Sequence, residues 1–228
     1  MNKRKKTREP QYQVQFDTID EKGPVHLGPT ASHLWRSDPR HLGFLLARYK
    51  FCAKMLAGKS SVLDVGCGDG FGTRVVLQEV KAVHGIDFDS LFIEWAQKYA
   101  EHEELNCTFS VLDITQEAPT SKFDAAFSMD FIEHIQAELE HKCMENICRA
   151  LEPHAICILG TPNITAKAYA SPWSAHGHIN LKSAESLREL LSRYFHNVFI
   201  FSMNDEVVHT GFYPMAHYLL GVGVGVKE

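Results

Sequence analysis

Four closely spaced glycines are the clearest sign of chemistry in this sequence. They follow a short apolar run, VLDV at residues 62–65, which contains one acid, Asp64. The glycines are Gly66, Gly68, Gly70 and Gly72. A turn with so few side chains lets a ligand approach the backbone, and the apolar spacing at 75–80 predicts a helix directly after it. Strand, glycine turn and helix in this order predict a nucleotide-binding α/β fold.

The spacing and charge of the turn narrow the kind of nucleotide. A dinucleotide-binding turn needs glycines in the order G-x-G-x-x-G, but Phe71 stands at the third glycine position. Asp69 would place a negative charge beside a bound pyrophosphate, and no lysine follows as a P-loop requires. The turn therefore suits a nucleoside that carries no phosphate and has a positively charged end.

Two further acids end the next two apolar runs. The first run, KAVHGIDF, brings Asp87 to a position 23 residues after Asp64, with Phe88 beside it. An acid there can accept hydrogen bonds from both ribose hydroxyls, and the aromatic ring can lie against adenine. The alternative is a solvated loop aspartate. The second run, CTFSVLDI, also ends in an acid, Asp113, and three such strands around one glycine turn favour the nucleoside interpretation.

Acids and histidines also gather after the fourth predicted strand. Asp130, Glu133 and His134 lie within about one helical turn of each other. His134 could act as a general base oriented by Glu133, because imidazole titrates near neutral pH. A metal site is the alternative, completed by His176 or His178 from the following loop, and its oxygen-rich ligands would suit a hard ion such as Mg2+. The third interpretation is that His134 only packs at the start of a helix.

Both segments resemble parts of a known family. An acid followed by G-x-G-x-G is similar to motif I of the class I S-adenosylmethionine-dependent methyltransferases, whose cofactor carries an ammonium and a sulfonium. The segment MDFIEHI at 129–135 resembles the Met-Glu-x-x-Glu-His-Val stretch of the ubiquinone-biosynthesis O-methyltransferases, with Asp130 in place of the first glutamate. It is also similar to the Glu-x-x-Glu-His of metal-dependent small-RNA 3′-terminal methyltransferases. The resemblance covers residues 34–228.

This resemblance implies a cofactor site and a reaction. Asp113 would take the adenine amino group, Ile114 would offer its backbone N–H to the ring, and Met129 would lie near the adenosine. The predicted cofactor site thus comprises Asp64, Gly66, Gly68, Gly70, Asp87, Phe88, Asp113, Ile114 and Met129. The candidate catalytic residues are His134 and His178, and the candidate metal ligands are Glu133, His134 and His178.

The implied reaction is methyl transfer to a small molecule. Oxygen is the favoured acceptor atom and nitrogen the less favoured one. An RNA or protein methyltransferase and a non-catalytic protein that binds S-adenosylmethionine stay open as alternatives. The compact chain without a basic recognition domain argues against the first of these, and the intact motifs argue against the second.

Alternating strands and helices must position these residues. The fold class predicted is α/β, a Rossmann-like seven-stranded, mostly parallel sheet with helices on both faces and an antiparallel last strand. The predicted strands cover 62–65, 81–88, 107–114, 123–129, 155–160, 198–203 and 219–226. Ser90 and Ser183 are predicted to cap helices. Residues 164–180 show no period and are predicted to form an active-site loop.

The N-terminal part is predicted to differ from the rest. Residues 1–33 begin with the basic segment MNKRKKTREP and show no sustained period, so a tail and arm are expected before a methyltransferase domain at 34–228. The apolar face of residues 41–56 predicts a helix. In enzymes of this fold such a helix closes over the cofactor, so Arg48 or Tyr49 could meet its carboxylate; the alternative is a surface arginine.

Composition limits the partners. With 23 basic and 28 acidic residues among 228, the net charge is −5, so nucleic acid is an unlikely substrate. No apolar stretch reaches about 18 residues, which predicts no membrane span. The six cysteines form no C-x-x-C pair and are expected to be reduced core residues of a cytoplasmic protein. Oligomeric state is open, and a dimer is possible.

Overall fold

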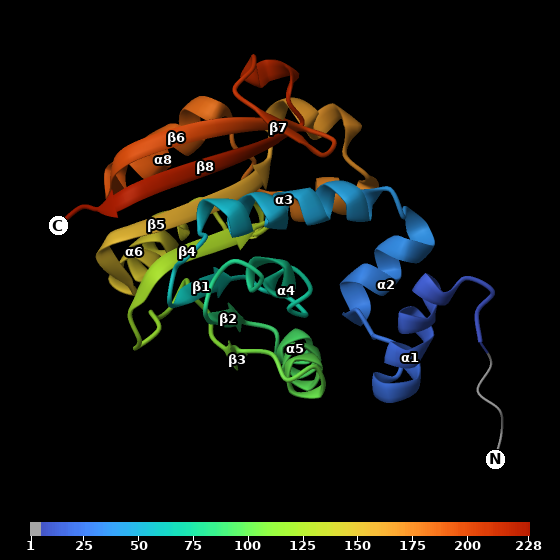
Figure 1. The fold of residues 1–228 in the computed structure, drawn as a ribbon. Helices are drawn as coiled ribbons and strands as arrows, with labels where there is room; N and C mark the ends of the chain where they lie inside the picture. Colours follow the sequence, from blue (N-terminus) through green and yellow to red (C-terminus); the bar gives the residue numbers. More distant parts are fainter. Residues whose placement is uncertain (1–5) are drawn as a thin grey trace.

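Eight strands form one sheet in the computed structural model, which describes residues 6–228 (Figure 1). The strand order is β3-β2-β1-β4-β5-β8-β6-β7. The strands from β3 to β5 in this order run parallel, and β8 is antiparallel to both of its neighbours. The strands are β1 (Val62–Val65), β2 (Val83–Asp87), β3 (Cys107–Val111), β4 (Phe123–Met129), β5 (Leu151–Pro162), β6 (Phe195–Asn204), β7 (Val207–His209) and β8 (Tyr218–Val226).

Helices cover both faces of this sheet, as predicted. One core cluster joins the sheet to α6 and α8, and a second joins the opposite face to α3 and α4. A third, smaller cluster lies under α5. The helices are α1 (Gln13–Lys22), α2 (Gly28–Ser37), α3 (His41–Met55), α4 (Thr73–Val76), α5 (Ser90–His102), α6 (Glu140–Arg149), α7 (Pro172–Gly177) and α8 (Ala184–Tyr194). The 3-10 turns are η1 (Pro10–Tyr12), η2 (Ile132–His134), η3 (Ile164–Tyr169) and η4 (Tyr213–Met215).

The register of the parallel strands brings the predicted site residues to one edge. All four residues of β1 are buried, which explains why the run is apolar apart from Asp64. Val65 pairs with Ile86, so the glycine turn and Asp87 leave the sheet side by side. Met129 pairs with Gly160 in the same way, and the segment after β4 therefore starts beside the end of β5.

The sheet has one strand more than the seven predicted. The extra strand, β7, forms a short hairpin with β6 at the sheet edge, and Asp205 in the turn has a left-handed backbone with φ of 48°. Three residues are too few to show an alternating pattern, so this segment was predicted as a connection. The capping prediction is confirmed for Ser183 and is wrong for Ser90, because Asp89 accepts the hydrogen bond from Leu91 N–H.

The predicted N-terminal arm is wrong in its local structure. Two helices, α1 and α2, lie where no helix was expected, and residues 1–5 of the basic tail lie outside the described residues. A helix shows a hydrophobic period in its sequence when one of its faces is buried. Helix α1 buries no residue and α2 buries only Ala31, so neither is expected to have such a period. The loop predicted at 164–180 likewise contains two short helical segments, η3 and α7.

Two further sequence predictions concern cysteines and membrane spans. All six cysteines are free, and four of them are buried. Within residues 6–228, no helix has both the length and the apolar character that crossing a bilayer requires.

One buried side chain joins the end of β5 to the segment before β8. Asn163, 2% exposed, donates from Nδ2 to the carbonyls of Tyr213 and Ala216 at 2.8 and 2.9 Å. Asn163→Ala leaves both carbonyls without this donor, so we expect the free energy of unfolding in urea to fall by about 1–3 kcal/mol. The control Asn197→Ala, at an exposed position of β6, should change it by no more than about 0.5 kcal/mol. Equal effects would contradict the role of Asn163.

Candidate active site

The predicted nucleoside site opens into a large cavity at the carboxyl edge of the sheet. Its volume is about 760 Å³, and its walls come from the glycine turn, α2, α3 and the segment after β5. The side chains of Arg48, Asp130 and His178 reach it from three different elements. Ligands of open parallel sheets bind at this edge, so the cavity is the main candidate for a binding site.

The glycine turn has a backbone that other residues would strain. Gly66, Gly68 and Gly70 have φ of 71°, 53° and 74°, in the left-handed region that glycine tolerates. At Gly66 there is also no room, because an added Cβ would lie 2.4 Å from the ring of Phe131. The glycines therefore serve the backbone conformation, and Gly66 and Gly70 also make room for the rings of Phe131 and Phe109. The predicted close approach of a ligand stays a prediction.

Asp64 lies beneath this turn and is almost fully buried. Its carboxylate accepts a hydrogen bond of 2.6 Å from the hydroxyl of Thr73, at the start of α4. Burial raises the pKa of Asp64 to about 7; the Thr73 hydrogen bond opposes this shift and the charge of Asp87 adds to it. Asp64 thus holds the turn to the following helix from below.

The residues predicted to hold adenosine surround a second, narrow cavity. It has a volume of about 30 Å³, and Asp87, Phe88, Asp113 and Ile114 line it together with Phe131. Asp87 accepts hydrogen bonds from the backbone N–H groups of residues 68 and 89, at 3.0 and 2.9 Å. The structure thus brings the acids after β2 and β3 together beside the glycine turn.

Met129 does not lie in this group. It is 4% exposed, and its sulfur packs 3.9 Å from Cys52 Sγ and 4.0 Å from the Tyr218 hydroxyl, in the core beneath α3. It lines neither the large nor the narrow cavity. Met129 thus points into the core beneath α3. Phe131, which lies beyond the left-handed backbone of Asp130, lines the narrow cavity instead.

Arg48 of α3 is a buried residue, and the prediction of a surface arginine is wrong. Its Nη1 donates to both carboxylate oxygens of Asp130, at 2.8 and 2.7 Å, and its guanidinium lies 3.7 Å from the ring centroid of Tyr218. Its Nε has no hydrogen-bond partner in the described chain. Asp130 has a left-handed φ of 53°, so this ion pair holds a strained backbone directly after β4.

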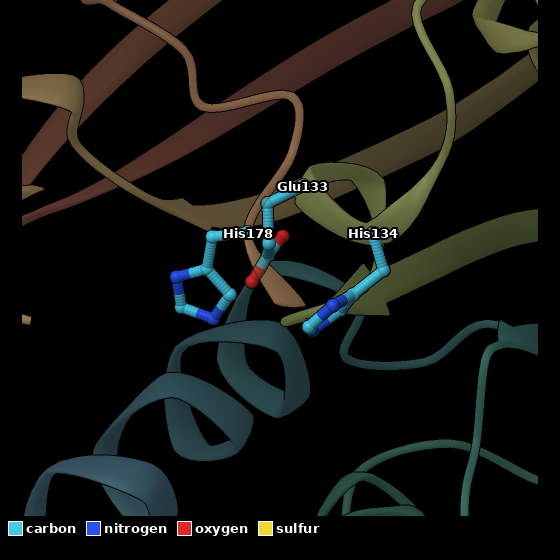
Figure 2. A group of neighbouring side chains, drawn as sticks. All are labelled: Glu133, His134 and His178. Atoms are coloured by element: carbon cyan, nitrogen blue, oxygen red, sulfur yellow. The ribbon is translucent and has the colours of Figure 1, made fainter. Parts of the chain in front are cut away.

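Glu133, His134 and His178 form a cluster beside the large cavity, and His178 is the member of the cluster that lines its wall. Each offers one ligand atom, and these atoms lie within 4.8 Å of one another. Figure 2 shows the three side chains converging, and the centroids of the two imidazole rings are 5.0 Å apart. The geometry brings together the three residues predicted as metal ligands, while Asp130 is paired with Arg48 and His176 is exposed outside the group.

The three side chains differ in their surroundings. Glu133 is fully buried; Thr161 donates to its Oε2 at 3.1 Å, and its Oε1 has no partner in the described chain. Burial raises the pKa of Glu133 to about 8, and the charge of Asp130 adds to this. His134 Nδ1 lies 3.0 Å from the Gly177 carbonyl, which only accepts, so Nδ1 carries the proton and Nε2 has a free lone pair.

A polar network that the sequence did not reveal holds the loop containing His178. Lys182 forms a buried ion pair with Glu140 of α6 and donates to Asn180 Oδ1 at 2.9 Å. The Asn180 N–H in turn donates to the Glu133 carbonyl at 3.0 Å. No spacing rule joins residues on different elements in this way. These contacts fix His178 relative to Glu133.

Two further histidines line the large cavity; His41 gave no signal in the sequence, whereas His217 flanks a loop that the sequence allowed as part of the pocket. His41 and His217 line the large cavity on either side of Phe44, at ring-centroid distances of 4.8 and 6.3 Å from it. Burial lowers the pKa of both imidazoles, and the charge of Arg48 lowers it further. At neutral pH both rings are therefore uncharged walls of the cavity.

Fold and site together define a Rossmann-like protein with a nucleoside-type turn and a large adjoining cavity. Residues 62–154 match the model of the methyltransferase domain family. The chain is 30% identical over 161 residues to a ubiquinone biosynthesis O-methyltransferase of Psychrobacter arcticus. The match covers 68% of this chain and 58% of the relative. A protein of the same name from Coxiella burnetii is 29% identical over 159 residues, covering 66% of each chain.

A solved structure shows the same fold. The N-methyltransferase NodS of Bradyrhizobium japonicum in complex with S-adenosylhomocysteine superposes with a TM-score of 0.61 at 17% identity, covering 92% of this chain and 97% of that one. Residues 62–154 thus match a methyltransferase domain, and the chain as a whole is similar in sequence and fold to S-adenosylmethionine-dependent methyltransferases. It spans less than two thirds of the length of the Psychrobacter relative.

The raised pKa of Asp64 predicts a pH-dependent stability. The folded protein keeps this proton up to about pH 7, whereas the unfolded chain loses it near the ordinary value of 3.8. Its contribution to stability is therefore present at low pH and lost as the pH rises towards 7. Asn does not titrate, so the free energy of unfolding of Asp64→Asn should rise relative to the original protein between about pH 5 and pH 7 and stay level above.

Urea denaturation at a series of pH values measures this difference. Glu117→Gln, at an exposed position, is the control and should show a difference that is flat over the same range. A flat difference for Asp64→Asn would contradict the raised pKa.

Proposed function

We propose that this chain transfers a methyl group from S-adenosylmethionine to an oxygen of a small-molecule acceptor. The observation that carries the proposal is the position of the glycine turn: it lies between the acids after β2 and β3 on one side and the large cavity on the other. A cofactor across the turn would have its nucleoside on the first side and its sulfonium on the second. The names of the matched relatives support oxygen as the acceptor atom.

The nucleoside would lie where the narrow cavity now is. Asp87 would accept hydrogen bonds from the ribose, Phe88 would lie against the adenine, and Asp113 with Ile114 would bind its edge. A volume of about 30 Å³ is the space of one water, so adenosine needs side chains to move. Two aromatic rings are in a position to move. Phe131 lies over Gly66, and Phe88 is 72% exposed.

The transfer step itself needs alignment more than covalent help. A methyl sulfonium is already activated, so the protein promotes an in-line displacement by holding the two reactants and excluding water. The acceptor hydroxyl must also lose its proton. In this proposal His134 takes it at Nε2, because the Gly177 carbonyl holds the other ring nitrogen as a donor. His178, its neighbour in the cluster, is the member that lines the large cavity.

The same three residues also fit a metal ion. Glu133 Oε1, buried without a partner, and the converging imidazoles of His134 and His178 form a ready ligand set. A bound divalent ion would lower the pKa of an acceptor hydroxyl. The set has one carboxylate and two imidazoles, so it is less oxygen-rich than the sequence indicated, and it suits Mn2+, Fe2+ or Zn2+ better than Mg2+.

Cofactor binding gives the first test. Calorimetry should show that the protein binds S-adenosylhomocysteine and binds NAD poorly, because Phe71 stands where a dinucleotide-binding turn needs its third glycine. Asp87→Ala should weaken S-adenosylhomocysteine by about 1–3 kcal/mol, through loss of charge-assisted hydrogen bonds. Asp89→Ala, two residues away, removes a carboxylate that lines neither cavity and should leave affinity unchanged. Equal or tighter NAD binding would overturn the cofactor assignment.

The reacting end gives the second test. His134→Ala should leave the affinity for S-adenosylhomocysteine nearly unchanged and lower turnover by about 10²–10⁴-fold, the usual contribution of a positioned acid or base. His176→Ala, an exposed histidine outside the cluster, is the matched control. A structural role for His134 would instead lower the melting temperature and retain turnover per folded molecule.

Chelation separates the base from the metal. If a metal acts, a chelator abolishes turnover, Mn2+ or Zn2+ restores it, and His178→Ala is as damaging as His134→Ala. Turnover that is insensitive to chelator, with His134→Ala still inactive, selects the base. Full activity in both tests would favour an already nucleophilic amine as the acceptor.

A further inference from the structure

One carboxylate of the glycine turn contacts a helix 39 residues earlier in the chain. Asp69 Oδ2 accepts a hydrogen bond of 2.8 Å from the backbone N–H of Thr30, in the first turn of α2. Its Oδ1 accepts a hydrogen bond from the Phe71 N–H at 3.3 Å, so the carboxylate is also fixed to its own turn. Asp69 is 4% exposed, and it therefore does not point into a phosphate site as the sequence suggested.

This contact replaces a local cap at the start of α2. The first N–H groups of a helix lack partners within the helix, and a side chain at the N-cap usually satisfies one of them. Here the N-cap residue is Leu27, which makes no such bond, and Pro29 has no N–H. The charge of Asp69 also lies at the positive end of the helix dipole.

Gly28 shows how closely the two segments approach. Its φ is 88°, and an added Cβ would lie 2.6 Å from Asp69 Oδ2. A larger residue would thus both strain the backbone and displace the carboxylate. The first residue of α2, Gly28, and the acid within the glycine turn fit each other.

Besides the contact with Asp69, α2 packs lightly against α3 and α5. Ala31 is its one buried residue within the described chain, and the burial of a single methyl group stabilises a helix position only weakly. The preceding helix, α1, buries none. Yet Thr30 and Leu34 form part of the wall of the large cavity, and Asp38 at the end of α2 lines it too. The position of this wall therefore depends on the contact with Asp69.

We propose that Asp69 is a positioning residue, which holds α2 as a wall of the acceptor cavity and transmits cofactor binding at the glycine turn to that wall. The inference rests on the proposed function, because it takes the turn to be the cofactor site. Gly68 and Gly70 flank Asp69, so a cofactor lying on the turn restricts the Asp69 backbone. A restricted Asp69 keeps its carboxylate on the Thr30 N–H and orders the first turn of α2.

Hydrogen exchange of the full chain, with and without S-adenosylhomocysteine, tests this proposal. In the original protein the amides of residues 30–37 should exchange more slowly once the ligand is bound. In Asp69→Ala they should exchange about 2- to 30-fold faster without ligand, the range expected for a lost N-cap, and the ligand should no longer slow them. Asp69→Asn keeps an oxygen acceptor, so its α2 amides should exchange at a rate between those of the original protein and Asp69→Ala. If Asp69→Ala does not fold, Asp69→Asn is compared with the original protein instead.

Asp89→Ala is the matched control. Asp89 caps α5 by accepting the Leu91 N–H, and it lines neither cavity, so its loss should speed exchange in α5 and leave α2 unchanged. Unchanged α2 exchange in Asp69→Ala, or equal acceleration of α2 in Asp89→Ala, overturns the proposal. Ligand-dependent slowing that persists in Asp69→Ala also overturns it. If the original protein binds no S-adenosylhomocysteine, the proposed function fails, while exchange without ligand still decides whether Asp69 holds α2.

Discussion

The ion pair between Arg48 and Asp130 is the contact on which the geometry of the site depends. It joins side chains 82 residues apart, one on α3 and one directly after β4. Because Asp130 has a left-handed backbone, the chain turns there, which places Phe131 over Gly66 and buries Glu133. Arg48 is buried, whereas the Asp130 side chain is 30% exposed, so loss of Asp130 would leave the guanidinium charge buried without its partner and α3 depends on the segment after β4.

The buried acids around this pair have different roles because their partners differ. Asp130 has a full positive charge beside it, whereas Asp64 has one hydroxyl donor and Glu133 has one hydroxyl and an oxygen without a partner. Burial therefore raises the pKa of Asp64 and of Glu133. A buried carboxyl that is incompletely satisfied is costly to fold, and such groups gather where a ligand completes their contacts.

Much of the fold and part of the site could be predicted because they depend on local sequence. Glycine spacing at 66–70 and the acids that end β2 and β3 follow from strand and turn rules, and the structure places them together. The resemblance places Met129 beside the adenosine, whereas its side chain lies in the core beneath α3, because a matched motif does not fix the direction in which each side chain points. Helix α2 and the Lys182 network gave no signal, because a cap from Asp69 and an ion pair between distant elements leave no sequence period.

The protonation of His134 limits what the reacting cluster can do at any one time. The Gly177 carbonyl fixes the proton on Nδ1, so Nε2 has a single lone pair. That lone pair can bind a metal ion or accept the acceptor's proton, but not both. With a metal bound, deprotonation of the acceptor would depend on the ion's charge, and the neutral imidazole of His178 would complete its ligands. Without one, the buried Glu133 keeps its proton near neutral pH, so His134 is the stronger candidate base of the pair.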